Sequence, residues 1–166
     1  ENRAGVERLL AAGARVRYFD HHFAGEVPRH PALETHLDPS PRLCTSLLVD
    51  RYLGGAQRAW AVTGAFGDNL IEPAQEAAAA LALPAAEREA LRELGELLNY
   101  NGYGDTLADL HFHPAELYRA AAPYADPLEF FRKAPQVAVL ERGHAQDLAE
   151  AQSGDLVLDD RAGRVF

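Results

Sequence analysis

The residues of this chain best suited to chemistry are Asp20, His21 and His22, which stand together after a short apolar segment. Imidazole nitrogens bind divalent transition metals, and a nearby carboxylate can fix the imidazole tautomer through the second ring nitrogen. Asp20 is placed for that supporting role. Because neighbouring residues of a strand point to opposite faces, His21 and His22 can converge only if the chain turns after Asp20.

A further carboxylate, Asp68, follows the apolar segment 58–66 in the run Gly64-Ala65-Phe66-Gly67-Asp68. A histidine and an aspartate on separate elements are donors on which an oxygen-rich metal site would draw. Each group also has a purely structural interpretation. The triplet at 20–22 could be a polar loop with satisfied hydrogen bonds, and Asp68 could be an ordinary turn residue.

The elements that would position these residues follow an open α/β pattern. The sequence predicts a helix at 2–14 and a strand at 15–19 that leads into the triplet. A second short strand is expected at 33–37, within a loop that runs to residue 41. Ser40 and Pro41 suit the N-cap and first turn of a helix that reaches residues 54–55. Ligands of such sheets bind outside the carboxyl ends of the strands.

The second half of the chain is predicted to be rich in helices. Helix-forming residues and apolar spacing place helices at 77–80, 85–98, 114–122, 127–133 and around 146–152. The tail, 155–166, is expected to form a hairpin. The fold class is therefore α/β, with a mainly parallel sheet and flanking helices, followed by a helix-rich segment.

The stretch from Tyr18 to Asn69 resembles the DHH phosphoesterases, a family named for its Asp-His-His motif. Residues 20–22 match the third motif of that family, and Asp68 matches the fourth. The run Cys44-Thr45-Ser46 stands where the family often places small hydroxyl residues at a helix start. The resemblance implies a partial DHH-type catalytic domain over 1–104. A helical connector and the start of a further domain would occupy 105–166.

The resemblance also implies the chemistry. In this family two manganese ions activate a water or hydroxide that attacks phosphorus. His21 and Asp68 would then be metal ligands, while His22 would contact the phosphoryl oxygen or protonate the leaving group and Asp20 would orient its neighbours. Thr45 and Ser46 would bind phosphate at the helix start, with helix capping as the equal alternative.

Two parts of the family pattern are missing from these 166 residues. The first and second motifs, which would precede Asp20, are not found, and neither is the glycine-rich histidine motif of the C-terminal substrate domain. The chain also opens at Glu1 without methionine. We therefore expect a fragment that binds manganese poorly and by itself hydrolyses nothing measurable.

The composition of the chain excludes some classes of binding partner. A net charge of −9 argues against coating long duplex nucleic acid, because such binding depends on neutralising phosphates with Lys and Arg. A small phosphorylated or oligonucleotide substrate is expected instead, and a nucleotide-derived one is favoured. The single cysteine, Cys44, and the lack of a membrane-spanning apolar run suit a cytoplasmic protein. Homo-oligomers remain open.

Other histidines of the chain are also candidate metal ligands, and other functions are also compatible with the sequence. His111 and His113 alternate as strand neighbours do, but zinc sites need three or four ligands and no third is evident. His30 and His36 are expected to be loop residues. The run 99–104 suits either a nucleotide pocket or an exposed turn. Rival functions are a non-catalytic interaction or regulatory domain on a DHH fold and a transferase on the same scaffold.

Overall fold

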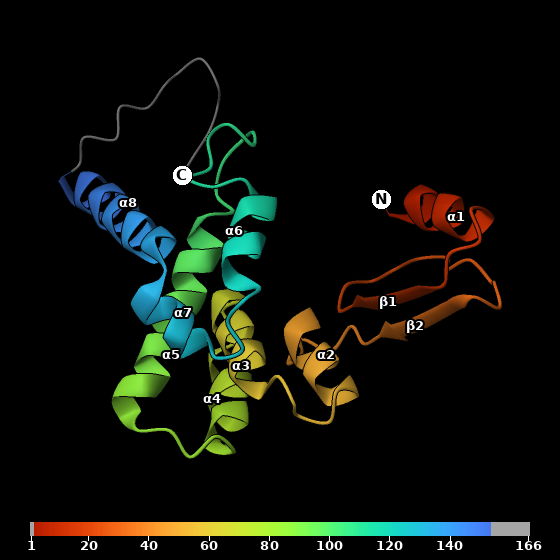
Figure 1. Cartoon of the computed structure of the whole chain (residues 1–166), viewed down its shortest axis with the longest axis horizontal. Coiled ribbons are helices and arrows are strands. Elements are labelled where there is room, and N and C mark those ends of the chain that lie inside the picture. Colours follow the sequence, from red (N-terminus) through yellow and green to blue (C-terminus); the bar gives the residue numbers. More distant parts are fainter. Residues whose placement is uncertain (1, 154–166) are drawn as a thin grey trace.

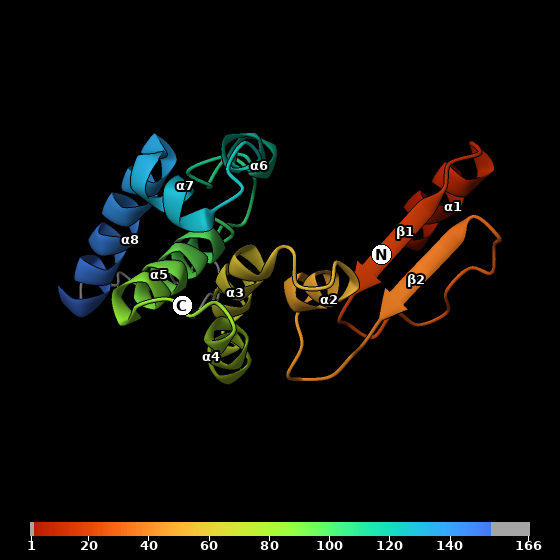
Figure 2. The ribbon, with the colours of Figure 1, turned by 60° about the horizontal axis from the view of Figure 1, so that its bottom comes forward.

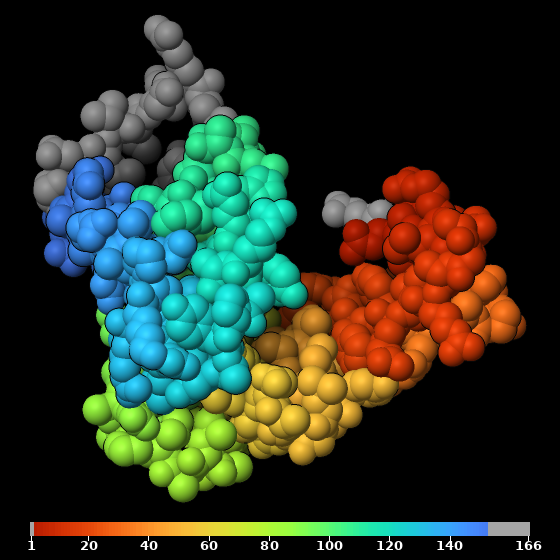
Figure 3. Space-filling view, viewed as in Figure 1, coloured from red at the N-terminus to blue at the C-terminus, as the bar shows by residue number. Residues whose placement is uncertain are grey.

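The computed structural model describes residues 2–153, which form a small strand unit and a larger helical body (Figure 1). The strand unit contains α1 (Arg3–Ala11), β1 (Val16–Asp20) and β2 (Leu33–Leu37). The helical body contains α2 (Thr45–Tyr52), α3 (Arg58–Gly67), α4 (Ile71–Ala79), α5 (Ala85–Tyr100), α6 (Pro114–Ala121), α7 (Pro127–Lys133) and α8 (Pro135–Ser153). The two parts meet where α2 contacts β1, and the space-filling view shows them as separate masses joined there (Figure 3).

The sheet of the strand unit has two parallel strands among the described residues, which pair along their whole length (Figure 2). On one face, the ring of Phe19 meets the ring of Tyr52 from α2 edge-on at 5.2 Å between centroids. On the other face, Asn2 beside α1 donates a hydrogen bond to the hydroxyl of Tyr18 at 3.4 Å. The expected α/β class with parallel strands is confirmed at this coarse level. Neither strand contains a buried residue.

The first helix of the body begins later than the sequence indicates. Ser40 and Pro41 lie in a turn, in which the amide of Leu43 donates to the carbonyl of Ser40 at 3.1 Å. Leu43 and Cys44 then enter the core, and Cys44 is extended, with φ −107° and ψ 168°. The prediction of a helix from Ser40 is therefore wrong, because burial of two consecutive side chains keeps this stretch extended. The helix starts at Thr45.

Other predicted elements are confirmed or extended. The strand at 33–37 and the helices at 114–122 and 127–133 lie within a residue of their expected bounds. The helix expected from residue 77 begins at Ile71, and the one expected around 146–152 is only the end of α8. The hairpin expected at 155–166 lies outside the described residues. No helix between residues 2 and 153 is long and apolar enough to cross a membrane.

The apolar core of the body has two clusters. One joins α2, α3 and α4 with Leu91 of α5 and Leu128 of α7, and the other joins the second half of α5 with α6, α7 and α8. Leu94 and Leu97 of α5 pack in the second cluster with Phe130 and Leu140, which lie beyond residue 104. The two segments therefore share a core, while the domain boundary expected at residue 104 stays a prediction.

Helix α3 lies at the centre of the body and approaches its neighbours closely on two sides. A Cβ placed on Gly67 would lie 2.6 Å from the carbonyl oxygen of Gly95 in α5. One placed on Gly95 would lie 2.2 Å from the carbonyl oxygen of Thr63. On the other side, a Cβ on Gly64 would lie 2.7 Å from the hydroxyl of Ser46 in α2. Gly67 and Gly95 permit a backbone-to-backbone approach and Gly64 admits a side chain, so the glycines before Asp68 serve helix packing.

Replacing Gly95 with alanine should therefore destabilise the helical body, although alanine is the better helix former. We expect a loss of about 3 kcal/mol, since the new methyl group meets backbone atoms that cannot move aside without separating α3 from α5. Thermal unfolding followed by circular dichroism measures the change. Gly5→Ala is the matched control, because a Cβ there has no heavy atom nearer than 4.0 Å. Equal melting temperatures for Gly95→Ala and the unmodified chain would contradict this packing.

Candidate functional site

The carboxylate of Asp20 ends β1 and fixes the turn that follows. Its Oδ1 accepts hydrogen bonds from the backbone N–H of His22 at 3.0 Å and from Nδ1 of His22 at 2.9 Å. Its Oδ2 accepts from the hydroxyl of Tyr18 at 2.9 Å. Aspartate side chains commonly bond to the backbone two residues further on, which turns the chain. The rings of His21 and His22 consequently lie 4.1 Å apart between centroids, so the turn required for their convergence is present.

These donors favour the ionised form of Asp20. The backbone N–H of His22, then the His22 side chain and the Tyr18 hydroxyl, lower the pKa of Asp20 from 3.8 to about 2. An ionised carboxylate can only accept hydrogen bonds, so Nδ1 of His22 carries the hydrogen. The Nε2 atom of His22 is therefore the nitrogen left to exchange a proton with a ligand, and 76% of the side chain is exposed.

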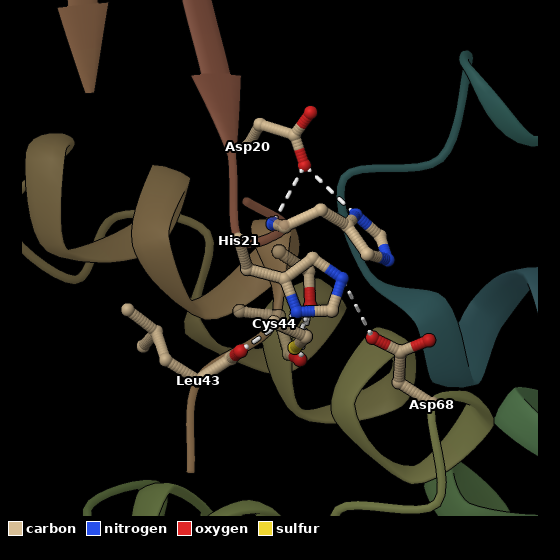
Figure 4. A network of polar contacts seen from close by, with 8 residues as sticks. Asp20, His21, Leu43, Cys44 and Asp68 are labelled. Carbon is tan, nitrogen blue, oxygen red and sulfur yellow. Dashed lines mark hydrogen bonds and ion pairs between the residues drawn. The ribbon is translucent and has the colours of Figure 1, made fainter. Parts of the chain in front are cut away.

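His21 is held by a different acceptor. Its Nδ1 lies 2.9 Å from the carbonyl oxygen of Leu43, the buried residue that precedes Cys44 and α2 (Figure 4). A carbonyl only accepts, so Nδ1 of His21 must be protonated, and Nε2 of the neutral ring has a free lone pair. This is the tautomer in which histidine binds a metal through Nε2 while a protein acceptor orients the ring.

Asp68 faces that lone pair. Oδ2 of Asp68 lies 3.7 Å from Nε2 of His21, and both side chains are labelled in Figure 4. Asp68 is the C-cap of α3, where the helix dipole is negative and gives a carboxylate no stabilisation. The two atoms form an ion pair when the ring of His21 is protonated. When the ring is neutral, a cation could take the place of that proton between Nε2 and the carboxylate.

The donor set fits part of a divalent metal site. Nε2 of His21 and Oδ2 of Asp68 would be the atoms that hold such an ion, since imidazole nitrogens and carboxylate oxygens both bind divalent metals. One imidazole and one carboxylate suit manganese or zinc equally well. Among residues 2–153, no group of three or more His, Cys, Asp or Glu side chains is arranged to hold a metal ion. The site therefore brings together two side-chain ligands.

The start of α2 lies against this site, with its two hydroxyl residues in different surroundings. The hydroxyl of Ser46 donates to the carbonyl of Ala61 in α3 at 3.1 Å and lies 3.0 Å from Sγ of the buried Cys44. It thus belongs to the packing between α2 and α3. Thr45 is the first residue of the helix, and the Cys44 side chain does not cap it. Phosphate binding by Thr45 and Ser46 stays a prediction.

The remaining candidate histidines have local structural partners. Nδ1 of His113 caps α6 by accepting from the amide of Ala115 at 3.1 Å, and Nδ1 of His30 accepts from the amide of Ala32 at 3.1 Å. His36 lies in β2, where it stacks on Phe19, so the expectation that it is a loop residue is wrong. His111 bonds to the hydroxyl of Tyr100 at 2.9 Å. None of these four rings is brought to the pair formed by His21 and Asp68. The turn at 99–104 is held by the buried Asn101, which bonds to the backbone of Phe112.

Two partners of the site were not identified from the sequence. Tyr18 donates to Asp20 from two positions earlier on the same strand, and the alternation of strand residues could have revealed it. The carbonyl of Leu43 is a backbone atom of an apolar residue, and nothing in the sequence marks it. The tautomer of His21 depends on this second partner.

The low pKa of Asp20 has a measurable consequence. The group releases its proton more easily in the folded protein, so its stabilising effect is full above pH 4 and is lost as the pH falls towards 2. Tyr18→Phe should raise the pKa of Asp20 but leave it below 3.8, because both His22 donors remain. Carbon-13 NMR titration of the carboxyl group tests this, with Tyr118→Phe as the control. An unmodified chain in which Asp20 titrates at its ordinary value would contradict the geometry.

No protein-family model, curated protein or solved structure matches this chain. The resemblance to DHH phosphoesterases therefore rests on the motif residues themselves.

Proposed function

We propose that residues 1–104 form the central part of a DHH-type catalytic domain. The proposed activity is metal-dependent hydrolysis of a phosphoester or phosphoanhydride. The observation that carries the proposal is the pair formed by Nε2 of His21 and Oδ2 of Asp68, 3.7 Å apart. The two residues come from different parts of the fold, and His21 is held in the tautomer that a metal requires.

His21 and Asp68 would hold one manganese ion, and the family resemblance implies a second. When bound, such ions supply an activated water and positive charge opposite the phosphoryl oxygens. The protein's own contribution is to keep both donors in place. The Leu43 carbonyl orients the ring of His21, and α3 holds Asp68 at its C-terminal end.

His22 would act on the leaving group. Its Nδ1 is bound to Asp20, so Nε2 is the atom that passes a proton. The water oxygen forms the new P–O bond, the bond from phosphorus to the leaving oxygen breaks, and that oxygen takes the proton from Nε2. The proton lost by the water goes to solvent, from which His22 is reprotonated. Ionised Asp20 stabilises the imidazolium and keeps it oriented, as a carboxylate does beside a catalytic histidine.

The substrate would be small and nucleotide-derived. A protein with a net charge of −9 repels a long polyphosphate chain unless bound cations offset the charge, whereas a short substrate meets mainly the metal site. Short oligonucleotides remain within this class, and long duplexes do not.

A second candidate is a non-catalytic interaction domain on the same scaffold. The observation in its favour is that only two side-chain ligands meet among the described residues. It would need neither the exposed Nε2 of His22 nor the fixed tautomer of His21. Metal binding and turnover separate the two candidates.

Manganese should bind at His21 and Asp68, if only weakly. In the proton–nitrogen NMR spectrum, paramagnetic broadening by millimolar Mn²⁺ should affect the backbone signals of these two residues first. His21→Ala and Asp68→Asn should each weaken the apparent affinity by about 10-fold or more, since each removes one donor. His111→Ala is the matched control and should change nothing. Broadening centred on His111 and His113 instead would refute the assignment.

His22 should matter for turnover and not for metal affinity. In the natural protein that carries this chain, His22→Ala should lower kcat on a model phosphodiester by about 100-fold or more, because the leaving oxygen loses its proton donor. Titration calorimetry with Mn²⁺ should give nearly the same affinity as for the unmodified protein. His30→Ala serves as the control for loss of an exposed imidazole. Turnover equal to that of the unmodified protein would remove His22 from the mechanism.

A further inference from the structure

A cavity of about 310 Å³ borders Asp20 and His22. Its walls come from α1, from one face of the sheet and from the segment 23–28 that follows the histidines. Its size falls at the lower end of small-ligand sites. The lining combines the apolar side chains of Val6, Phe23 and Leu33 with the polar ones of Arg3, Tyr18 and Glu26.

The segment 23–28 is held over the cavity by an ion pair with α1. Nη1 of Arg3 lies 3.2 Å from Oε2 of Glu26, and Nε of Arg3 lies 2.9 Å from Oε1 of Glu7. Gly25 has a positive φ of 62°, which lets the segment turn back towards α1. Both members of the Arg3–Glu26 pair are exposed, so the pair contributes little to stability.

Phe23 is the unusual residue of this wall. It directly follows His22, and its side chain is 90% exposed. Packing within the described part of the chain therefore does not account for a phenyl ring at this position. An exposed aromatic ring at the edge of a cavity is the arrangement that binds a flat ring by stacking.

The charges of the cavity favour a neutral ligand. Asp20 and Glu26 contribute two carboxylates, and the guanidinium of Arg3 is already shared between Glu26 and Glu7. A phosphate group in this space would meet uncompensated negative charge. A neutral group with hydrogen-bonding edges would not, and it could use the carboxylate of Glu26 and the amide of Asn2.

We propose that this cavity receives the leaving group of the substrate, and that Phe23 selects a nucleoside there by stacking on its base. The inference rests on the proposed role of His22, because a leaving oxygen that takes a proton from Nε2 of His22 lies at the mouth of the cavity. A second phosphate is therefore not the preferred leaving group. The substrate is thus a phosphoester with a nucleoside on the leaving side.

Binding can be tested without metal or turnover. In Phe23→Trp, adenosine should quench the added tryptophan fluorescence to a saturable end point, whereas ribose 5-phosphate, which lacks a base, should not. The unmodified chain gives the background from its one tryptophan, Trp60. Tyr118→Trp places a tryptophan at another exposed position and controls for collisional quenching. Absence of saturable quenching by adenosine, or equal quenching by ribose 5-phosphate, would overturn the inference.

A kinetic measurement separates this inference from the proposed function. In the natural protein that carries this chain, Phe23→Ala should raise KM for a dinucleotide by about 10-fold and leave kcat within about twofold, as loss of one base stack predicts. Hydrolysis with an unchanged KM would refute the role of Phe23 and leave the proposed phosphoesterase activity unaffected. Saturable adenosine binding without hydrolysis would support the base site and refute the phosphoesterase.

Discussion

The close contact of α3 with α5 at Gly67 and Gly95 is the constraint on which the candidate site depends. Backbone meets backbone there, so α3 has no freedom to slide or rotate against α5. On its other side, Gly64 admits the side chain of Ser46, which also donates to the carbonyl of Ala61 and so holds α2 against α3. The end of α3 therefore has one position relative to the start of α2. Asp68 follows the end of α3, and the carbonyl of Leu43, which orients His21, precedes the start of α2. Helix packing therefore sets the distance between the side chains of His21 and Asp68.

The two histidines are held by acceptors of different charge, and this difference suits different tasks. His21 bonds to a neutral carbonyl, which orients the ring and places a hydrogen on Nδ1. His22 bonds to an ionised carboxylate, which stabilises the positive ring as well as orienting it. In the proposed reaction, His21 would hold the metal through its neutral ring and His22 would pass the proton.

Sequence reasoning located the triplet at the end of a strand, the turn after Asp20 and Asp68 at the end of an apolar element. Each of these follows from local pattern, such as strand alternation or a helix stop. It could not find the carbonyl of Leu43, because backbone acceptors carry no residue signature. It placed the start of α2 at Ser40 because local capping signals point there, whereas burial of Leu43 and Cys44 is decided by the helices that pack around them. Local sequence patterns do not contain information on contacts between elements that are distant in the chain.

The strands of the small unit contain no buried residue, and this has a thermodynamic consequence. The strands have fewer buried side chains than α3 and α5, so we expect the strand unit to be locally less stable than these helices. His21 belongs to the weakly held part and Asp68 to the firmly held one. Any ligand shared by both would act as a cross-link, and its binding free energy would appear as added stability of the junction between them. Folding of the strand unit and occupation of the site are thus linked equilibria, each of which strengthens the other.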